Sequence, residues 1–252
     1  MMQKRIWSFG NALFFLAAIS VCRAEPEFKT GLQVEYFNYR EPGVMTEQGM
    51  LAGLCASYGS DISADIDWRL KASYVMGNLS YQSDSETGLD LSGSTPNRIM
   101  DARGEIGHPL LIRGRVLHLY TGVAGRLLID DLPGFSGLQG YTREQTYLYL
   151  PIGVDVELAS NKTRTVTARV EYDWFVQGWN RSDGITMNQD SGYGCQASLN
   201  VSRDKDFLCF RRLDFEPFIQ YWNVGKSDLG AGLFYEPPNS SVMLGIRLTG
   251  HF

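Results

Sequence analysis

The chain has 252 residues, of which 44% are hydrophobic, and its 23 basic and 28 acidic residues give a formal net charge of −5. Three of the basic residues and none of the acidic ones lie within residues 1–24, so the remainder is more acidic still. This balance argues against nucleic acid as a partner and against a broad basic surface for anionic partners. The roughly 230 residues after position 24 suit one domain, including the all-β barrels that run long as a single unit.

Residues 1–24 have the composition of a secretory signal peptide. Two basic residues come first, residues 12–19 form an unbroken apolar run, and Cys22-Arg23-Ala24 precedes the expected cleavage point. The alternative is a lipoprotein signal ending at that Cys, although Val21 stands where such sites usually have Gly, Ala or Ser. No later apolar run approaches the roughly 20 residues that a membrane helix needs. If residues 25–252 enter a membrane, they therefore cross it as strands.

Ten later segments alternate apolar and polar residues with the period of two that a β-strand imposes. In the seventh, Val170 and Trp174 on one face alternate with Arg169, Glu171 and Asp173 on the other. A charged face on nearly every strand is incompatible with a dry core on that side, and the pattern is typical of a transmembrane barrel. The segments span residues 31–39, 50–58, 64–81, 98–108, 115–129, 146–158, 165–179, 193–201, 213–222 and 241–252.

The connections between these segments alternate in length. Short or polar connections cover residues 59–63, 111–114, 159–164 and 202–212, whereas long ones cover 83–97, 130–145, 180–192 and 223–239, and residues 41–48 form the shortest outer loop. Short periplasmic turns and long outer loops are the rule for outer-membrane barrels. We therefore predict that residues 25–252 form an all-β, transmembrane, antiparallel up-and-down β-barrel. Ten strands are expected, with eight or twelve as alternatives.

The last segment has the clearest alternation and ends the chain on an aromatic residue. Leu248, Gly250 and Phe252 lie on its apolar face, and we predict that they signal barrel assembly. A terminal strand of this kind is similar to those of bacterial outer-membrane barrels, and residues 39–45, 147–153 and 235–252 resemble a group of small Gram-negative outer-membrane proteins without an assigned activity. The resemblance implies an outer-membrane location, with lipid, lipopolysaccharide and the barrel-assembly machinery as partners. It carries no functional residue over.

Ionic residues of both signs fall on the inward face of nearly every strand. Because ten strands enclose only a narrow lumen, we expect these residues to form a self-paired polar plug, with a conduction pathway as the alternative. Arg126 and Arg169 are expected to be held across the lumen by the carboxylates on these strands, Asp155, Glu157, Glu171 and Asp173. The predicted ion-pair network comprises Arg69, Asp101, Arg103, Arg126, Asp155, Glu157, Arg169, Glu171, Asp173 and Arg247.

Candidate catalytic residues are few. The predicted topology places His108, His118 and His251 at the periplasmic end, so none is a general base at the outer rim. The chain shows neither a Ser and His arrangement resembling a lipid A deacylase nor the acidic pairs plus His of the omptin proteases. We therefore predict no catalytic residue and leave enzymatic activity open, while favouring a protein that is not an enzyme. The run at 84–90 lacks the full spacing of a calcium loop, so no metal or cofactor is predicted.

Two Glu-Pro corners are expected to meet on the outer rim. Glu41-Pro42 follows the first strand and Glu236-Pro237 precedes the last, and barrel closure makes these strands neighbours. The simpler interpretation is that the prolines end the strand pairing and restrict the backbone where each loop meets its strand. The alternative is a ligand or cation site at Glu41 and Glu236.

Three cysteines follow the leader, and their pairing is open. Cys195 and Cys209 flank a predicted turn and could pair, whereas the alternative makes both of them, and Cys55, small buried free thiols. For the whole chain we expect a role in envelope structure or in surface interactions, with long loops facing an external partner that the sequence does not identify. A narrow, porin-like channel for small polar solutes is the alternative, and an outer-face enzyme comes third.

Overall fold

The computed structural model describes residues 26–83, 91–132, 140–207, 209–230 and 234–252. The predicted signal peptide at 1–24 and the acidic run at 84–90 lie outside these ranges. The strands are β1 (Glu27–Glu41), β2 (Met45–Ser63), β3 (Ile66–Ser83), β4 (Ser92–Ile112), β5 (Arg115–Leu132), β6 (Tyr141–Asn161), β7 (Arg164–Ser182), β8 (Ile185–Gln189), β9 (Gly192–Phe207), β10 (Phe210–Val224) and β11 (Asn239–His251).

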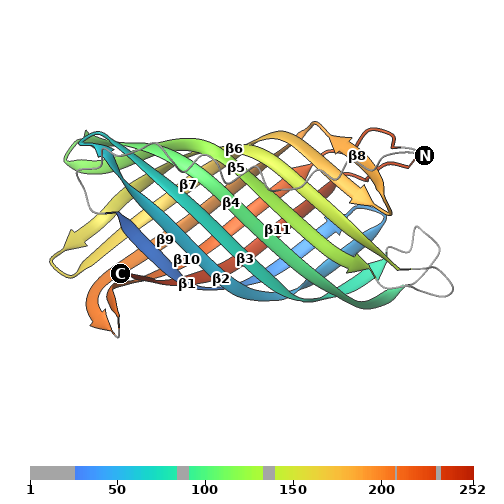
Figure 1. The fold of residues 1–252 in the computed structure, drawn as a ribbon, viewed down its shortest axis with the longest axis horizontal. Coiled ribbons are helices and arrows are strands. Elements are labelled where there is room, and N and C mark those ends of the chain that lie inside the picture. The colour runs from blue at the N-terminus through green and yellow to red at the C-terminus, as the bar shows by residue number, and fades with distance from the viewer. Residues whose placement is uncertain (1–25, 84–90, 133–139, 208, 231–233) are drawn as a thin grey trace, which may run out of the picture.

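Ten of these strands close into one antiparallel barrel (Figure 1). The sheet follows the order β6-β5-β4-β3-β2-β1-β11-β10-β9-β7, and pairing of β6 with β7 closes it. The terminal strands pair along their length, from Lys29 opposite His251 to Arg40 opposite Ser240. The predicted fold is confirmed, because each of the ten predicted segments coincides with one of these strands, apart from residues 64–65 in the turn before β3 and Phe252 after β11.

The strand β8 lies inside residues 180–192, which the sequence predicted to be a loop. It pairs with the end of β7 alone, through a turn in which Asp183 and Gly184 both have positive φ. Two consecutive residues with positive φ match the tight turn of a two-residue hairpin. Five residues are too short for a periodic signal, which is why the sequence did not predict this strand.

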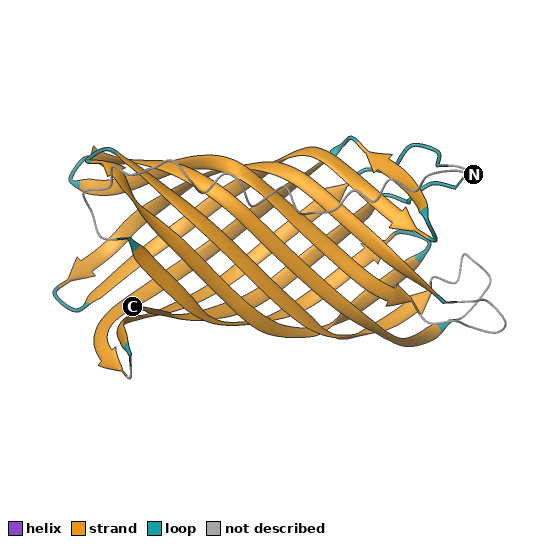
Figure 2. Cartoon of the chain, viewed as in Figure 1, coloured by secondary structure: helices purple, strands orange, loops and turns teal. Residues whose placement is uncertain are grey.

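The two ends of the barrel differ, as Figure 2 shows. The chain's C-terminus lies at the end with the short turns, where residues 113–114 join β4 to β5 and residues 162–163 join β6 to β7. The longer connections lie at the opposite end. By the barrel rule the short-turn end faces the periplasm and the other end faces outward. We call these the inner and outer ends.

The outer wall of the barrel is apolar. Leu54 is 62% exposed, Val170 is 61% exposed and Leu248 is 52% exposed, although all three lie within strands. Large aliphatic side chains exposed all around a barrel are stable against lipid rather than water. None of the described segments forms a helix that is long and apolar enough to cross a membrane.

The predicted alternation over residues 165–179 holds only as far as Val176. A register shift between β6 and β7 occurs between Leu148 and Tyr149, and beyond it Gly178 and Asn180 continue the buried face. Gln177, which the strict period of two placed on the inward face, instead lines a groove at the outer end. One extra residue in a strand changes the phase of every residue that follows.

The cysteines do not pair. Cys195 lies on the exposed face in register with Tyr221, far along the strand from Cys209 at the β9–β10 turn, and all three described thiols are free. Cys55 alone is buried, so neither predicted alternative holds in full.

Candidate functional site: the barrel lumen

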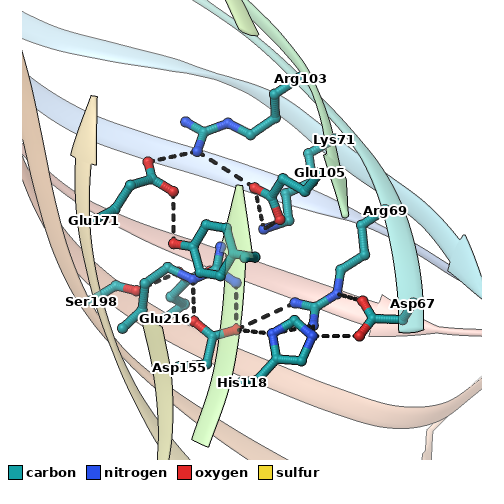
Figure 3. Close-up of polar contacts among 12 residues, drawn as sticks. Asp67, Arg69, Lys71, Arg103, Glu105, His118, Asp155, Glu171, Ser198 and Glu216 are labelled. Carbon is teal, nitrogen blue, oxygen red and sulfur yellow. Dashed lines mark hydrogen bonds and ion pairs between the residues drawn. The ribbon is translucent and has the colours of Figure 1, made fainter. Parts of the chain in front are cut away.

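The inner half of the lumen carries a network of ion pairs (Figure 3). Arg169 on β7 donates Nε and Nη2 to the two carboxylate oxygens of Asp155 on β6, at 2.6 and 2.7 Å. Arg69 on β3 reaches the same carboxylate at 3.3 Å and Asp67 at 3.2 Å. His118 contacts Asp67 and lies against Arg69. Each charge in this part of the network therefore has an opposite charge within reach.

A second part of the network lies beside the first. Arg103 donates to Glu171 at 2.7 Å, Lys71 pairs with Glu105 at 2.8 Å, and the Tyr120 hydroxyl donates to Glu171 at 2.7 Å. A Cβ at Gly153 would lie 2.3 Å from the Tyr120 ring. The glycine on β6 thus leaves the space in which this tyrosine lies.

The structure brings together five of the predicted network residues, Arg69, Arg103, Asp155, Arg169 and Glu171. Arg247 lies apart from them, donating to Gln33 at 2.9 Å and pairing with Glu216 at 3.3 Å. Asp67, Lys71, Glu105 and His118 complete the network although they were not among the predicted members. The signal for them was present, because the same alternation placed them on the inward face.

Four predicted members form no ion pair with a described residue. Arg126 donates to Gln220 Oε1 at 3.5 Å and to Met243 Sδ at 3.1 Å, so none of the four predicted carboxylates holds it. Asp101 accepts from the Tyr149 hydroxyl at 3.2 Å. Glu157 lines the cavity described below, and both Asp173 carboxylate oxygens lack a hydrogen-bond partner among the described residues.

Next to the ion pairs, the middle of the lumen is filled by a layer of apolar and aromatic side chains, and buried polar residues return beyond it at the outer mouth. Phe37, Leu51 and Tyr149 are fully buried and Trp222 is 1% exposed, with the Tyr149 and Trp222 ring centroids 4.9 Å apart. The sequence held a signal for this layer, because the inward face changes from charged to apolar towards the outer end of several strands. Examples are Glu35 to Phe37 on β1, Asp173 to Phe175 on β7 and Glu216 to Phe218 on β10.

Glu41 and Glu236 lie together at the outer mouth, with Arg143 of β6 between them. Arg143 Nη1 contacts both carboxylates, at 3.2 Å for Glu236, and Nη2 donates to Asp130 at 2.7 Å. Glu236, in the connection from β10 to β11, also accepts from Gln145 at 2.8 Å, and burial raises its pKa to about 8. Among the described residues no group of three or more His, Cys, Asp and Glu side chains suits a metal ion. The arrangement is an anchor for this connection.

A cavity of about 820 Å³ occupies the inner half of the lumen. Glu27, Asp61 and Arg212 line it near the inner rim, whereas Glu35 and Met243 line it at the depth where the apolar layer begins. We call this cavity the inner chamber. It extends from the inner rim to the apolar layer.

The three histidines lie at the inner end and take part in contacts between strands. His108 contacts the Asp65 backbone oxygen, and His251 lies 2.5 Å from Glu27 and 2.8 Å from Asp214. His251 therefore links the last strand to both of its neighbours.

These features define a class: a closed, ten-stranded antiparallel barrel with an apolar outer wall and an ion-paired lumen, which is the architecture of outer-membrane β-barrels. No protein-family model and no curated protein matches the chain.

Several solved structures are similar. The outer membrane protease OmpT from Escherichia coli has a TM-score of 0.54 at 10% identity, over 90% of this chain and 96% of its own. The translocator domain of the autotransporter NalP from Neisseria meningitidis has a TM-score of 0.48 at 12% identity, over 90% and 88% of the two chains. The β domain of the Bordetella autotransporter BrkA has a TM-score of 0.44 at 10% identity, over 86% of this chain and 98% of its own. The likeness to OmpT shows the fold alone, and this chain has the fold of a Gram-negative outer-membrane β-barrel.

Proposed function

We propose that this protein is a closed, non-conducting barrel of the Gram-negative outer membrane that serves the envelope as a structural element and presents its outer connections to external partners. The observation that carries the proposal is the buried layer of Phe37, Leu51, Tyr149 and Trp222, none of which is more than 1% exposed. A water-filled pathway would need polar, hydrated surface at this level.

The anchored connection between β10 and β11 supports the same proposal. Glu236 binds Arg143 beneath it, and Ser227 exchanges hydrogen bonds with Glu236 of 3.0 and 2.7 Å. Asp228 receives bonds from the Asn188 backbone and side chain, at 2.7 and 3.0 Å. The connection is therefore fixed to both the barrel wall and the β8 hairpin, which suits a surface with a defined shape.

The partners at each surface follow from the same architecture. The apolar wall would contact lipid, and lipopolysaccharide would surround the outer half. The barrel-assembly machinery would recognise the end of β11, where Leu248 and Phe252 are 52% and 47% exposed on the outer wall. The three histidines, all at the inner end, give no support to an enzyme acting at the outer face.

A narrow channel for small polar solutes is the second candidate. The inner chamber favours this candidate, because a cavity lined by charged residues already extends from the inner rim through half of the lumen. The channel would require the apolar layer and the Glu236 anchor to move aside.

Conductance of the refolded protein in a planar bilayer separates the two candidates. We expect no steady conductance from the wild type. Trp222→Ala should admit ion current because it removes the largest side chain of the apolar layer, whereas Trp174→Ala, on the outer wall and 60% exposed, should remain silent. Steady single-channel conductance from the wild type would contradict the proposal and establish the channel.

A further inference from the structure

We propose that the outer mouth of the barrel holds its last connection in place by means of bound protons, and that loss of these protons releases residues 234–238 from the wall. The groups that hold the connection are Glu41, Glu47, Asp130, Arg143 and Glu236, which we call the latch. The inference goes beyond the proposed function, because it concerns the shape of the outer surface at different pH values and not the lumen beneath it.

The latch contains more acidic than basic groups, and all of them are buried. Arg143 contacts Glu41 and Glu236 through Nη1 and Asp130 through Nη2. Among the described residues, Arg143 is the only one that forms an ion pair with these three carboxyl groups. One guanidinium thus faces three carboxyl groups, none of which is more than 6% exposed. Surplus negative charge is costly at such a buried position, and a bound proton neutralises it.

Glu47 on β2 is an independent sign of a bound proton. It is 0% exposed, forms no ion pair with a described residue, and has no close hydrogen-bond partner among those residues for either carboxylate oxygen. Asp130 and Glu41 are its acidic neighbours, and Arg143 is its basic one. An ionised Glu47 would be a buried charge without a partner, which a protein avoids by binding the proton. Burial accordingly raises the pKa of Glu47 to about 8.

The latch lies above the part of the wall that faces lipid. Asn38 and Gln48 are on the outer face of β1 and β2, where Asn38 Nδ2 donates to Gln48 Oε1 at 3.3 Å. Glu47 immediately precedes Gln48 in the chain, and the exposed Arg40 immediately precedes Glu41. Because the outer wall is polar at this level, the latch lies outside the lipid, where its protons exchange with the external medium.

Release of the connection is expected to increase with pH. Burial raises the pKa of Glu236 to about 8, although Arg143 opposes this shift. After release into water, the same carboxyl group would ionise near its ordinary pKa of about 4.3. Between these two values the held form keeps a proton that the released form has lost, so release becomes about tenfold easier per pH unit for each such group. Release therefore increases up to a pH of about 8 and levels off above it.

The other titratable groups that face the latch are tyrosines. A tyrosine hydroxyl ionises only near a pH of about 10, and an arginine keeps its charge throughout. The carboxyl groups are therefore the ones that respond below that pH. The tyrosines are Tyr39, Tyr81, Tyr141 and Tyr147.

The peptide bond between Lys226 and Ser227 reports on release. The N–H of this bond, which belongs to Ser227, donates to the Glu236 carbonyl oxygen at 3.0 Å, and the Glu236 N–H donates to Ser227 Oγ at 2.7 Å. The Lys226 side chain is exposed, so trypsin can recognise it. A protease cleaves a hydrogen-bonded backbone only after local opening, and cleavage here therefore requires Ser227 to separate from Glu236.

Trypsin digestion of the refolded full chain in detergent micelles tests the inference, with the fragments quantified by mass spectrometry. Arg113, exposed in the turn between β4 and β5 at the inner end, is the reference site. The rate of cleavage after Lys226 is divided by the rate after Arg113, which removes the pH dependence of trypsin itself. We expect this ratio to increase at least about tenfold from about pH 6 to about pH 8 and to change little above. A constant ratio would overturn the inference.

Glu236→Gln and Glu47→Gln mimic the protonated carboxyl groups and cannot ionise. Each should make the ratio at about pH 8 at least about tenfold lower than in the wild type and flatten its increase with pH. Glu144→Gln is the matched control, because it removes the same charge from β6 beside Arg143 but from the outer wall, and should keep the wild-type profile.

Wild-type profiles in both latch variants would overturn the inference, as would a flattened profile in Glu144→Gln. Heat modifiability shows whether each variant is folded. The wild-type profile decides the outcome if a variant fails to fold, since that measurement needs no substitution.

Discussion

Arg143 gathers three carboxylates, from β1, β5 and the connection before β11, at a position that water does not reach. Its side chain is 3% exposed, and its guanidinium carbon lies 5.0 Å from the centre of the Tyr39 ring. Removing one partner of a buried ionic group leaves the others uncompensated, which costs far more than losing an exposed pair. Arg143→Ala should therefore lower the free energy of unfolding by about 3 to 5 kcal/mol in a urea titration in lipid vesicles.

Arg98 provides the control for Arg143. It pairs with Asp131 at 2.6 Å, yet the two side chains are 40% and 39% exposed. Arg98→Ala should cost only about 0 to 1 kcal/mol. Similar losses in the two variants would show that Arg143 is not the buried anchor of the outer mouth.

The last strand, β11, pairs with β1 on one side and β10 on the other, and Phe252 secures its terminus. The Phe252 ring stacks on Phe28 at 5.5 Å and meets Phe210 edge-on at 4.9 Å, while its N–H donates to the Phe28 carbonyl oxygen at 3.2 Å. Deleting Phe252 should reduce the amount of heat-modifiable, membrane-inserted protein, because it removes contacts to both neighbouring strands. Phe234→Ala, in the outer connection and 64% exposed, should have little effect. Wild-type levels of inserted protein without Phe252 would refute this role.

The outer wall of the barrel is apolar, whereas the surface of the inner chamber is polar. Val170 is 61% exposed on the outer wall, whereas Thr167 on the same strand lines the inner chamber. Val170→Arg should cost about 2 to 4 kcal/mol if it lies near the bilayer midplane, and Thr167→Arg far less because the chamber is polar. Refolding titrations in lipid measure both. Equal losses would mean that the wall at Val170 does not face lipid.

Local alternation determined the ten strands and the face on which each side chain lies. The polar face of β7 carries Arg169, Glu171 and Asp173, and the structure places all three side chains inside the barrel. This succeeds because a strand fixes the direction of successive side chains whatever its neighbours are. On β7 the predicted faces are wrong only beyond its register shift with β6, because a single extra residue cannot be recognised from the alternation of apolar and polar residues.

The pairing of charges was decided only by the tertiary structure. The sequence could place Arg126 and Arg169 on the inward face, but which carboxylate each one reaches depends on strand register and tilt. Arg169 meets Asp155, directly opposite it on β6, whereas Arg126 extends across the lumen to Gln220 on β10. The meeting of Glu41 with Glu236 followed from closure alone, but Arg143 between them did not, because residues 130–145 lay in a predicted loop. The sequence by itself thus determined which face each residue occupies, and the closed barrel decided the distances across the lumen, because those distances exist only once distant strands are joined.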